Sequence, residues 1–80
     1  MALRKAWTWQ EKVRNGEACV LLYGEYWVTA DEDADDPRFV IFAVSRGEFP
    51  THRVWRVPWD RAASEARQYA PLSRWRLARD

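Results

Sequence analysis

The sequence has few of the residue types on which catalysis and metal binding depend. Its 80 residues include one cysteine, Cys19, one histidine, His52, and three glycines. A lone cysteine excludes a disulfide within the chain, and one Cys with one His cannot complete a zinc site. A Cys19–His52 nucleophile would also need a third group to orient the base, and the sequence offers none. We therefore predict that the protein is not an enzyme and has no catalytic residue, metal site or cofactor.

Long apolar runs are missing as well. The longest such runs, 18–23 and 39–44, are far shorter than the ~20 residues that cross a bilayer. The basic residues near the N-terminus are not followed by the apolar stretch of a secretory signal. Together with the lone cysteine, these features lead us to expect a cytoplasmic protein without membrane contact.

Tryptophan and arginine are in excess, with six Trp and eleven Arg against two Lys. These two residue types dominate binding surfaces, because one offers a large ring with a polar group and the other a planar donor that stacks. A chain this small needs several Trp for its core, but the indole N–H groups need partners and the interior has little room. We expect one to three of the tryptophans to lie at the surface.

The net charge of +1 hides an uneven distribution of charge. Residues 1–45 carry five basic and eight acidic side chains, whereas residues 46–80 carry eight basic and four acidic ones. A surface with charges of both signs suits a protein partner better than a simple polyanion.

The first expected element is a short helix within 7–14. Thr8 and Glu11 match a capping box, and Asn15-Gly16 is a typical helix end. A strand is the alternative, because apolar and polar residues alternate over 7–14 and Asn-Gly also favours a hairpin turn.

Four strands are expected next. The apolar run 18–23 predicts a strand covered on both faces, and 26–29 forms a hairpin with it. The run 38–44, rich in β-branched and aromatic residues, predicts a central strand. A turn at 45–48 and a connection through Phe49-Pro50 lead to a fourth strand at 53–57, which stops at Pro58.

A second helix is expected at 61–70, with Asp60 as its N-cap and Pro71 after its end. Segment 73–79 is either an edge strand or an ordered tail. The architecture that fits is a single α+β domain over 1–80, with a curved antiparallel sheet of about four strands and both helices packed on it. If 7–14 is a strand, a five-stranded SH3-like or OB-like barrel with one helix becomes the alternative.

An acidic segment between two expected strands is the first candidate binding feature. It holds five carboxylates, namely Asp31, Glu32, Asp33, Asp35 and Asp36. Its start resembles the ligand spacing of a calcium loop, but Asp36 replaces the required Gly and Phe42 the required Glu. The remaining interpretations are a solvated connection and an anionic contact patch for a basic groove.

Arginine next to tryptophan is the second candidate feature. It consists of Arg53, Trp55 and Arg56 on the fourth strand and of Arg74, Trp75 and Arg76 near the end of the chain. These residues, together with Trp27, are candidate contacts for a protein, unless Trp55 and Trp75 belong to the core. They are also candidate stacking platforms for single-stranded nucleic acid, although scarce Lys and the acidic segment disfavour phosphate binding.

In size and character the chain resembles the small inhibitors encoded by phages and mobile elements, including anti-CRISPR proteins. The features concerned are the acidic segment 31–36 with Trp27, Trp55 and Trp75. The resemblance implies steric blocking of a nucleoprotein machine through a protein contact.

The sequence thus favours a non-enzymatic inhibitor or adaptor that binds another protein, such as a nucleic-acid-handling complex. A small domain that binds single-stranded nucleic acid directly is the alternative. The chain is expected to act as a monomer or a homodimer.

Overall fold

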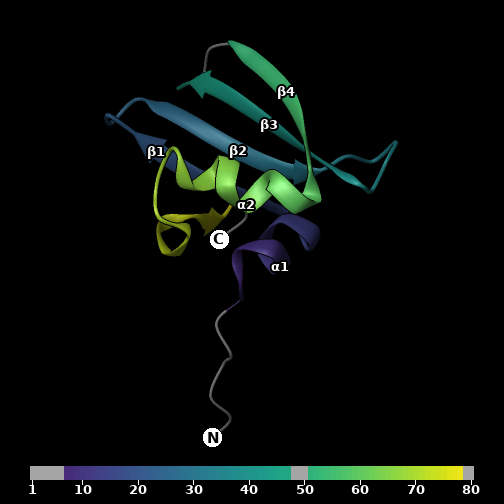
Figure 1. The fold of residues 1–80 in the computed structure, drawn as a ribbon. Coiled ribbons are helices and arrows are strands. Elements are labelled where there is room, and N and C mark those ends of the chain that lie inside the picture. The colour runs from purple at the N-terminus through teal and green to yellow at the C-terminus, as the bar shows by residue number, and fades with distance from the viewer. Residues whose placement is uncertain (1–6, 48–50, 79–80) are drawn as a thin grey trace, which may run out of the picture.

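The computed structural model describes residues 7–47 and 51–78. It has an α+β fold in which a five-stranded, open antiparallel sheet carries two helices on one side (Figure 1). The elements in chain order are α1 (Trp9–Arg14), β1 (Glu17–Leu22), β2 (Tyr26–Glu32), β3 (Phe39–Arg46), β4 (Arg53–Pro58), α2 (Trp59–Arg67), the 3₁₀ helix η1 (Leu72–Arg74) and β5 (Arg76–Leu77). This confirms the predicted α+β class. The barrel alternative is wrong, because the sheet stays open with β4 and β5 at its edges.

Helix α1 forms where the capping box predicted it. The Thr8 hydroxyl accepts a hydrogen bond from the backbone N–H of Glu11, and the Glu11 carboxylate accepts one from the backbone N–H of Thr8. These two bonds satisfy N–H groups that a helix start leaves without partners. Trp9 and Val13, four residues apart, point into the core from one side of the helix. The strand alternative for this segment is wrong.

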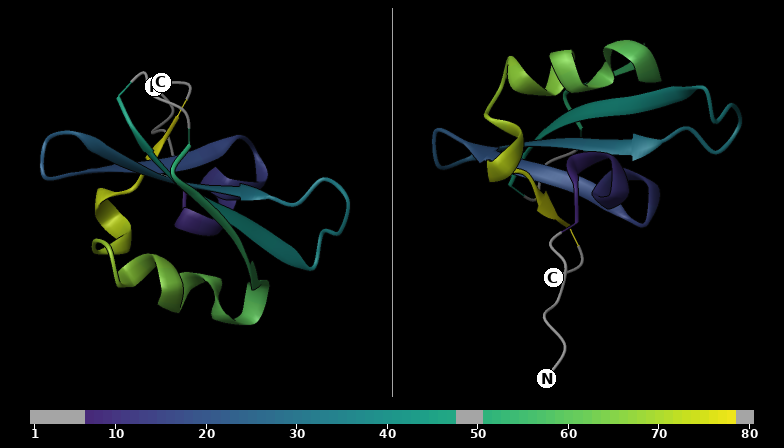
Figure 2. Two further views of the ribbon diagram at one scale, coloured as in Figure 1. Left: turned by 90° about the horizontal axis from the view of Figure 1, so that it is seen from above. Right: turned by 60° about the horizontal axis from the view of Figure 1, so that its bottom comes forward.

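The strands follow the order β4-β3-β2-β1-β5, so the first four form a simple meander. Pairing places Ala30 opposite Phe42, and Phe42 opposite Trp55. The buried residues of the three central strands therefore share one face, and they are Ala18, Val20, Val28, Ala30, Val40 and Phe42. Both helices pack on this face, and Figure 2 shows how strongly the sheet beneath them twists.

The prediction that β1 is covered on both faces is wrong, whereas β3 is the expected central strand, between β4 and β2. Buried residues in these strands alternate with partly exposed ones. The reason is that α1 and α2 lie on the same side and the described residues contain no element that covers the other side. The apolar runs therefore leave apolar side chains in contact with solvent.

Helix α2 begins at Trp59, directly after β4. Its N-cap is Pro58, which supplies no side-chain hydrogen bond, so the expected N-cap role of Asp60 is wrong. Asp60 instead lies in the first helical turn, where a carboxylate is favourable beside the helix N-terminus. Ala62 and Ala66 are fully buried, and their small side chains bring α2 close to the sheet.

Aromatic rings fill the space between helices and sheet. The Trp9 ring lies 5.9 Å from that of Trp75 and 6.3 Å from those of Phe42 and Trp59. Phe42 in turn stacks on Trp55 with 5.7 Å between ring centroids. The cluster joins α1, β3, β4, α2 and the C-terminal segment into one core.

The C-terminal segment forms η1 and then the short edge strand β5, which pairs Arg76 with Cys19. The edge-strand alternative for 73–79 is thus confirmed at 76–77. The expected connection through Phe49-Pro50 lies outside the described residues. Within 7–47 and 51–78, no helix has the length and apolarity that spanning a bilayer requires.

Candidate functional site

Two of the predicted surface tryptophans belong to the core. Trp75 is fully buried, and its Nε1 donates a hydrogen bond to the carbonyl of Ala70. Trp55 is half-buried, and its Nε1 donates to the Glu65 carboxylate at 2.7 Å. Both side chains pack on the helix-covered side of the sheet, which confirms the alternative that they contribute to the core. The prediction of Trp75 as a surface contact is therefore wrong, whereas Trp55 keeps a partly exposed side. Trp7, with 44% exposure, confirms that at least one tryptophan lies at the surface.

Most carboxylates of the acidic segment form ion pairs with arginines of the same chain. Asp33 is buried and accepts hydrogen bonds from the Arg56 guanidinium at 2.5 and 2.9 Å and from the backbone N–H of Asp35. Asp36 forms an ion pair with Arg38 at 2.8 Å. Glu32 pairs with Arg14. The prediction that Asp33 contacts a partner is wrong, because this carboxylate is buried and bound by Arg56. Glu32 and Asp36 stay partly exposed in their ion pairs, so a partner contact there remains a prediction.

These contacts lower the pKa of two loop carboxyl groups. The backbone N–H of Asp35 and then the Arg56 guanidinium hold the pKa of Asp33 below its usual range. Arg38 lowers the pKa of Asp36 to about 2. Asp31, near the end of β2, and Asp35, in the loop that follows, are exposed and form no ion pair within the described part of the chain, so they present the free negative charge of the acidic segment.

The uncovered side of the sheet forms a surface that we call the open face. It consists of the side chains that alternate with the core residues, including Cys19, Leu21, Trp27, Thr29, Ile41, Ala43, Val54 and Arg56. Leu21 and Val54 are 38% and 60% exposed. A shallow hollow of about 470 Å³ crosses the middle of this face, where Thr29, Ile41 and Ala43 line it. Asp31 lies at its rim.

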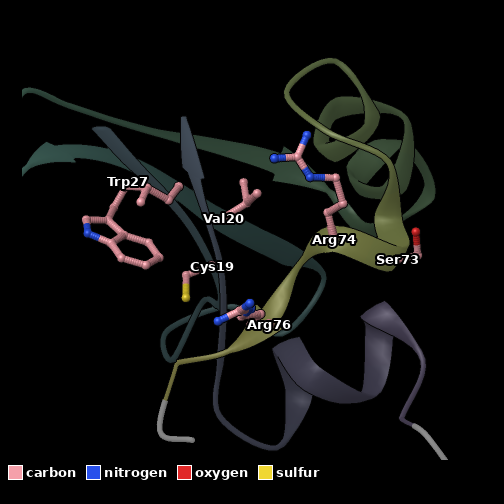
Figure 3. A pocket seen from close by; sticks show the side chains of 7 residues that line it. Cys19, Val20, Trp27, Ser73, Arg74 and Arg76 are labelled. Atoms are coloured by element: carbon pink, nitrogen blue, oxygen red, sulfur yellow. The ribbon is translucent and has the colours of Figure 1, made fainter. Parts of the chain in front are cut away.

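A groove of about 350 Å³ runs between β1 and the C-terminal segment, and we call it the β1 groove (Figure 3). Trp27 lies on one side of it, while Arg74 and Arg76 lie on the other, with Cys19 between them. The fold thus brings together three predicted site residues that are far apart in the sequence. Burial and then the neighbouring Glu17 raise the pKa of the Cys19 thiol, which keeps it in its weakly nucleophilic protonated form.

A second groove lies at the opposite edge of the sheet, between β4 and α2. This β4 groove has a volume of about 410 Å³ and is lined by Trp55, Arg56, Val57, Pro58, Arg61, Ser64, Glu65 and Gln68. The four helical residues follow the spacing of one helix face. The sequence analysis missed this site, although a polar stripe beside the alanine stripe of α2 could have indicated it.

The predicted Arg and Trp residues therefore divide between two edges of the sheet. Arg53 stacks over Trp55 at 4.6 Å, and Arg56 lies nearby on β4. Arg74 and Arg76 lie beside β1, at the other end of the strand order. One continuous Arg/Trp platform does not form.

Across the described residues, no three His, Cys, Asp or Glu side chains gather in a way that could hold a metal ion. Comparison with protein-family models, curated proteins and solved structures finds no match for this chain. The geometry above is therefore the basis for assigning a function.

Proposed function

We propose that this protein is a non-enzymatic inhibitor or adaptor that binds another protein through the open face of its sheet. The observation that supports this most is the exposure of Leu21 and Val54 on a sheet face that no described element covers. Exposed apolar patches rimmed by polar groups are typical of protein interaction sites. A contact of this kind on a nucleoprotein complex would block it sterically, as the resemblance to anti-CRISPR proteins implies.

The acidic segment contributes to this interface by attracting a basic partner before contact. Asp31 places unpaired negative charge beside the hollow of the open face, and Asp35 adds a second unpaired carboxylate in the loop after β2. Charges at the rim of an interface mainly raise the association rate and select the partner. We expect Asp31→Asn with Asp35→Asn to slow association and to weaken its dependence on salt.

The proposal is tested by capture of partners from a lysate of the source cells, with and without nuclease. Leu21→Lys and Val54→Lys place a charge on the open face at exposed positions. The matched control is Gln10→Lys, which adds the same charge at an exposed position of α1. Circular dichroism verifies that all three variants fold.

Wild type and Gln10→Lys are expected to retain a nuclease-resistant protein partner that Leu21→Lys and Val54→Lys lose. Each charged substitution should weaken the contact by about tenfold or more, the scale of one central interface residue. Equal capture by all four proteins would refute the role of the open face. Capture that disappears with nuclease would refute direct protein binding.

Direct binding of single-stranded nucleic acid is a second candidate, and the β1 groove favours it. One indole and two guanidiniums around a groove can stack a base and contact phosphates. This function predicts that Arg74→Glu with Arg76→Glu abolishes binding of a thymidine oligomer, whereas Arg67→Glu on α2 does not. No fluorescence quenching by the oligomer at low salt would eliminate it.

A further inference from the structure

The outer edge of β4 offers backbone groups for pairing. Trp59 donates its backbone N–H to the Arg38 carbonyl. In an antiparallel pair every second residue bonds to the neighbouring strand, so the backbone groups of the odd-numbered residues of β4 bond to β3. Because N–H and C=O of one residue point to the same side of an antiparallel strand, those of Val54 and Arg56 point away from the sheet. They have no backbone partner among the described residues. Pro58 has no N–H and ends this edge.

The edge lies beside a built groove. Helix α2 runs along it and presents Arg61, Ser64 and Gln68 as the opposite wall. The hydrogen bond from Trp55 Nε1 to Glu65, at 2.7 Å, connects strand and helix across the groove. Glu65 keeps its negative charge in this bond, and Arg56 is paired with Asp33. Arg61 is therefore the cation of the groove lining that forms no ion pair within the described residues.

Positive charge lies on the helix side of the edge and apolar surface on the other. Arg53 is exposed on the side of α2, because it shares the face of Trp55, and Arg61 is exposed on α2 itself. Val54, with 60% exposure, faces the open side. A strand added here would alternate its own side chains between these two environments.

We propose that the β4 groove binds an extended acidic segment of the partner protein as an additional strand. Main-chain hydrogen bonds to Val54 and Arg56 provide the pairing, and side chains that alternate between acidic and apolar provide the fit. Acidic side chains meet Arg53 and Arg61, while apolar ones meet Val54. This inference rests on the proposed function, since it specifies what kind of partner segment the protein binds.

The charge of the edge argues against a second copy of this chain as the occupant. Two β4 strands paired with each other would bring Arg53 and Arg61 of both copies together, and neither forms an ion pair among the described residues. Like charges across a strand pair are destabilising, and charged edge residues are a known protection against self-association. An acidic segment has the complementary charge.

The probe for the test is a fluorescein-labelled peptide of six residues in which glutamate and valine alternate. We expect its binding to raise fluorescence anisotropy and to protect the amide protons of Val54 and Arg56 from hydrogen exchange. Arg61→Glu should weaken binding by about tenfold, the loss of one charge-assisted contact. Arg67→Glu is the matched control on the same helix, outside the groove, and should bind like wild type.

Three further arms decide between occupants. A peptide with lysine in place of glutamate should not bind, and a peptide N-methylated at its pairing amides should not bind either. If the amides of Val54 and Arg56 stay unprotected at millimolar peptide, or if Arg67→Glu weakens binding as much as Arg61→Glu, the inference is wrong. Displacement of the peptide by a thymidine oligomer would overturn it in favour of nucleic acid. These results leave the proposed function untouched if Leu21→Lys still abolishes partner capture. Failure of the strand-pairing proposal is therefore distinguishable from failure of the proposed function.

Discussion

Residues of the same type have different roles in this protein, some in the core and others at the surface. Trp9 and Trp75 are buried among other rings, whereas Trp27 lies on the open face. Arginines divide in the same way, since Arg14 covers the ring of Trp59 at 4.3 Å and Arg61 faces a groove. The role of each residue follows from the face of its strand or helix, because residue type sets only which contacts are available.

The ion pair of Asp36 with Arg38 predicts a pH dependence of stability. The folded-state pKa of Asp36 is lowered to about 2, below its ordinary value of ~3.9, so the unfolded chain takes up this proton at a higher pH. The stability that the pair contributes is therefore present above pH ~4 and is lost as the pH falls toward 2. In urea titrations over this range, Asp36→Asn should lose less stability than wild type does. Asp35→Asn, in the same loop, is the control and should follow wild type; identical pH profiles for wild type and Asp36→Asn would contradict the prediction.

At the scale of elements, α1 is too short to be stable by itself. Isolated helices of six residues are far below the length at which they form in water. Its hydrogen-bonded cap and the burial of Trp9 and Val13 hold it in place. Local sequence thus starts this helix, and packing keeps it.

Removing the cap of α1 tests this account. Thr8→Ala eliminates the bond to the Glu11 N–H and should lower the free energy of unfolding by about 1 kcal/mol. Urea denaturation measures the change. Gln10→Ala, at an exposed position of the same helix, should change stability by less than about 0.5 kcal/mol. A Thr8→Ala variant as stable as Gln10→Ala would show that packing alone holds the helix.

At the scale of the whole molecule, one face of the sheet carries the core and the other is exposed. The covered face carries the aromatic cluster to which α1, β3, β4, α2 and the C-terminal segment all contribute. The open face and the two edge grooves carry the exposed apolar and charged groups. Stability and proposed binding therefore depend on different sides of one sheet.

A shared cluster predicts cooperative unfolding. No helix can leave without exposing rings that the other elements also contact, so the molecule should unfold in one step. Unfolding curves from far-ultraviolet circular dichroism and from tryptophan fluorescence should then coincide. Separate midpoints would show that part of the cluster can unfold alone.

Prediction from the sequence succeeded where a local signal was strong. The capping box of Thr8 and Glu11 identified α1, and the apolar runs identified β1 and β3. It left open whether Trp55 and Trp75 face a partner or the core, because strand alternation does not say which face a helix will cover, and because Trp75 lies outside the strands, directly after η1. It also missed the β4 groove, whose wall comes from Arg61 and Gln68 on the next element.

The sequence by itself determined the α+β class, the start of the first helix and the surplus of indoles and guanidiniums over what so small a core needs. Each of these follows from composition or from residues close together in the chain. Only the tertiary structure decided that both helices share one face and that Asp33 is bound by Arg56. It also decided that Trp27 meets Arg74 and Arg76 beside β1. These are contacts between distant segments, and they depend on the packing of the whole chain.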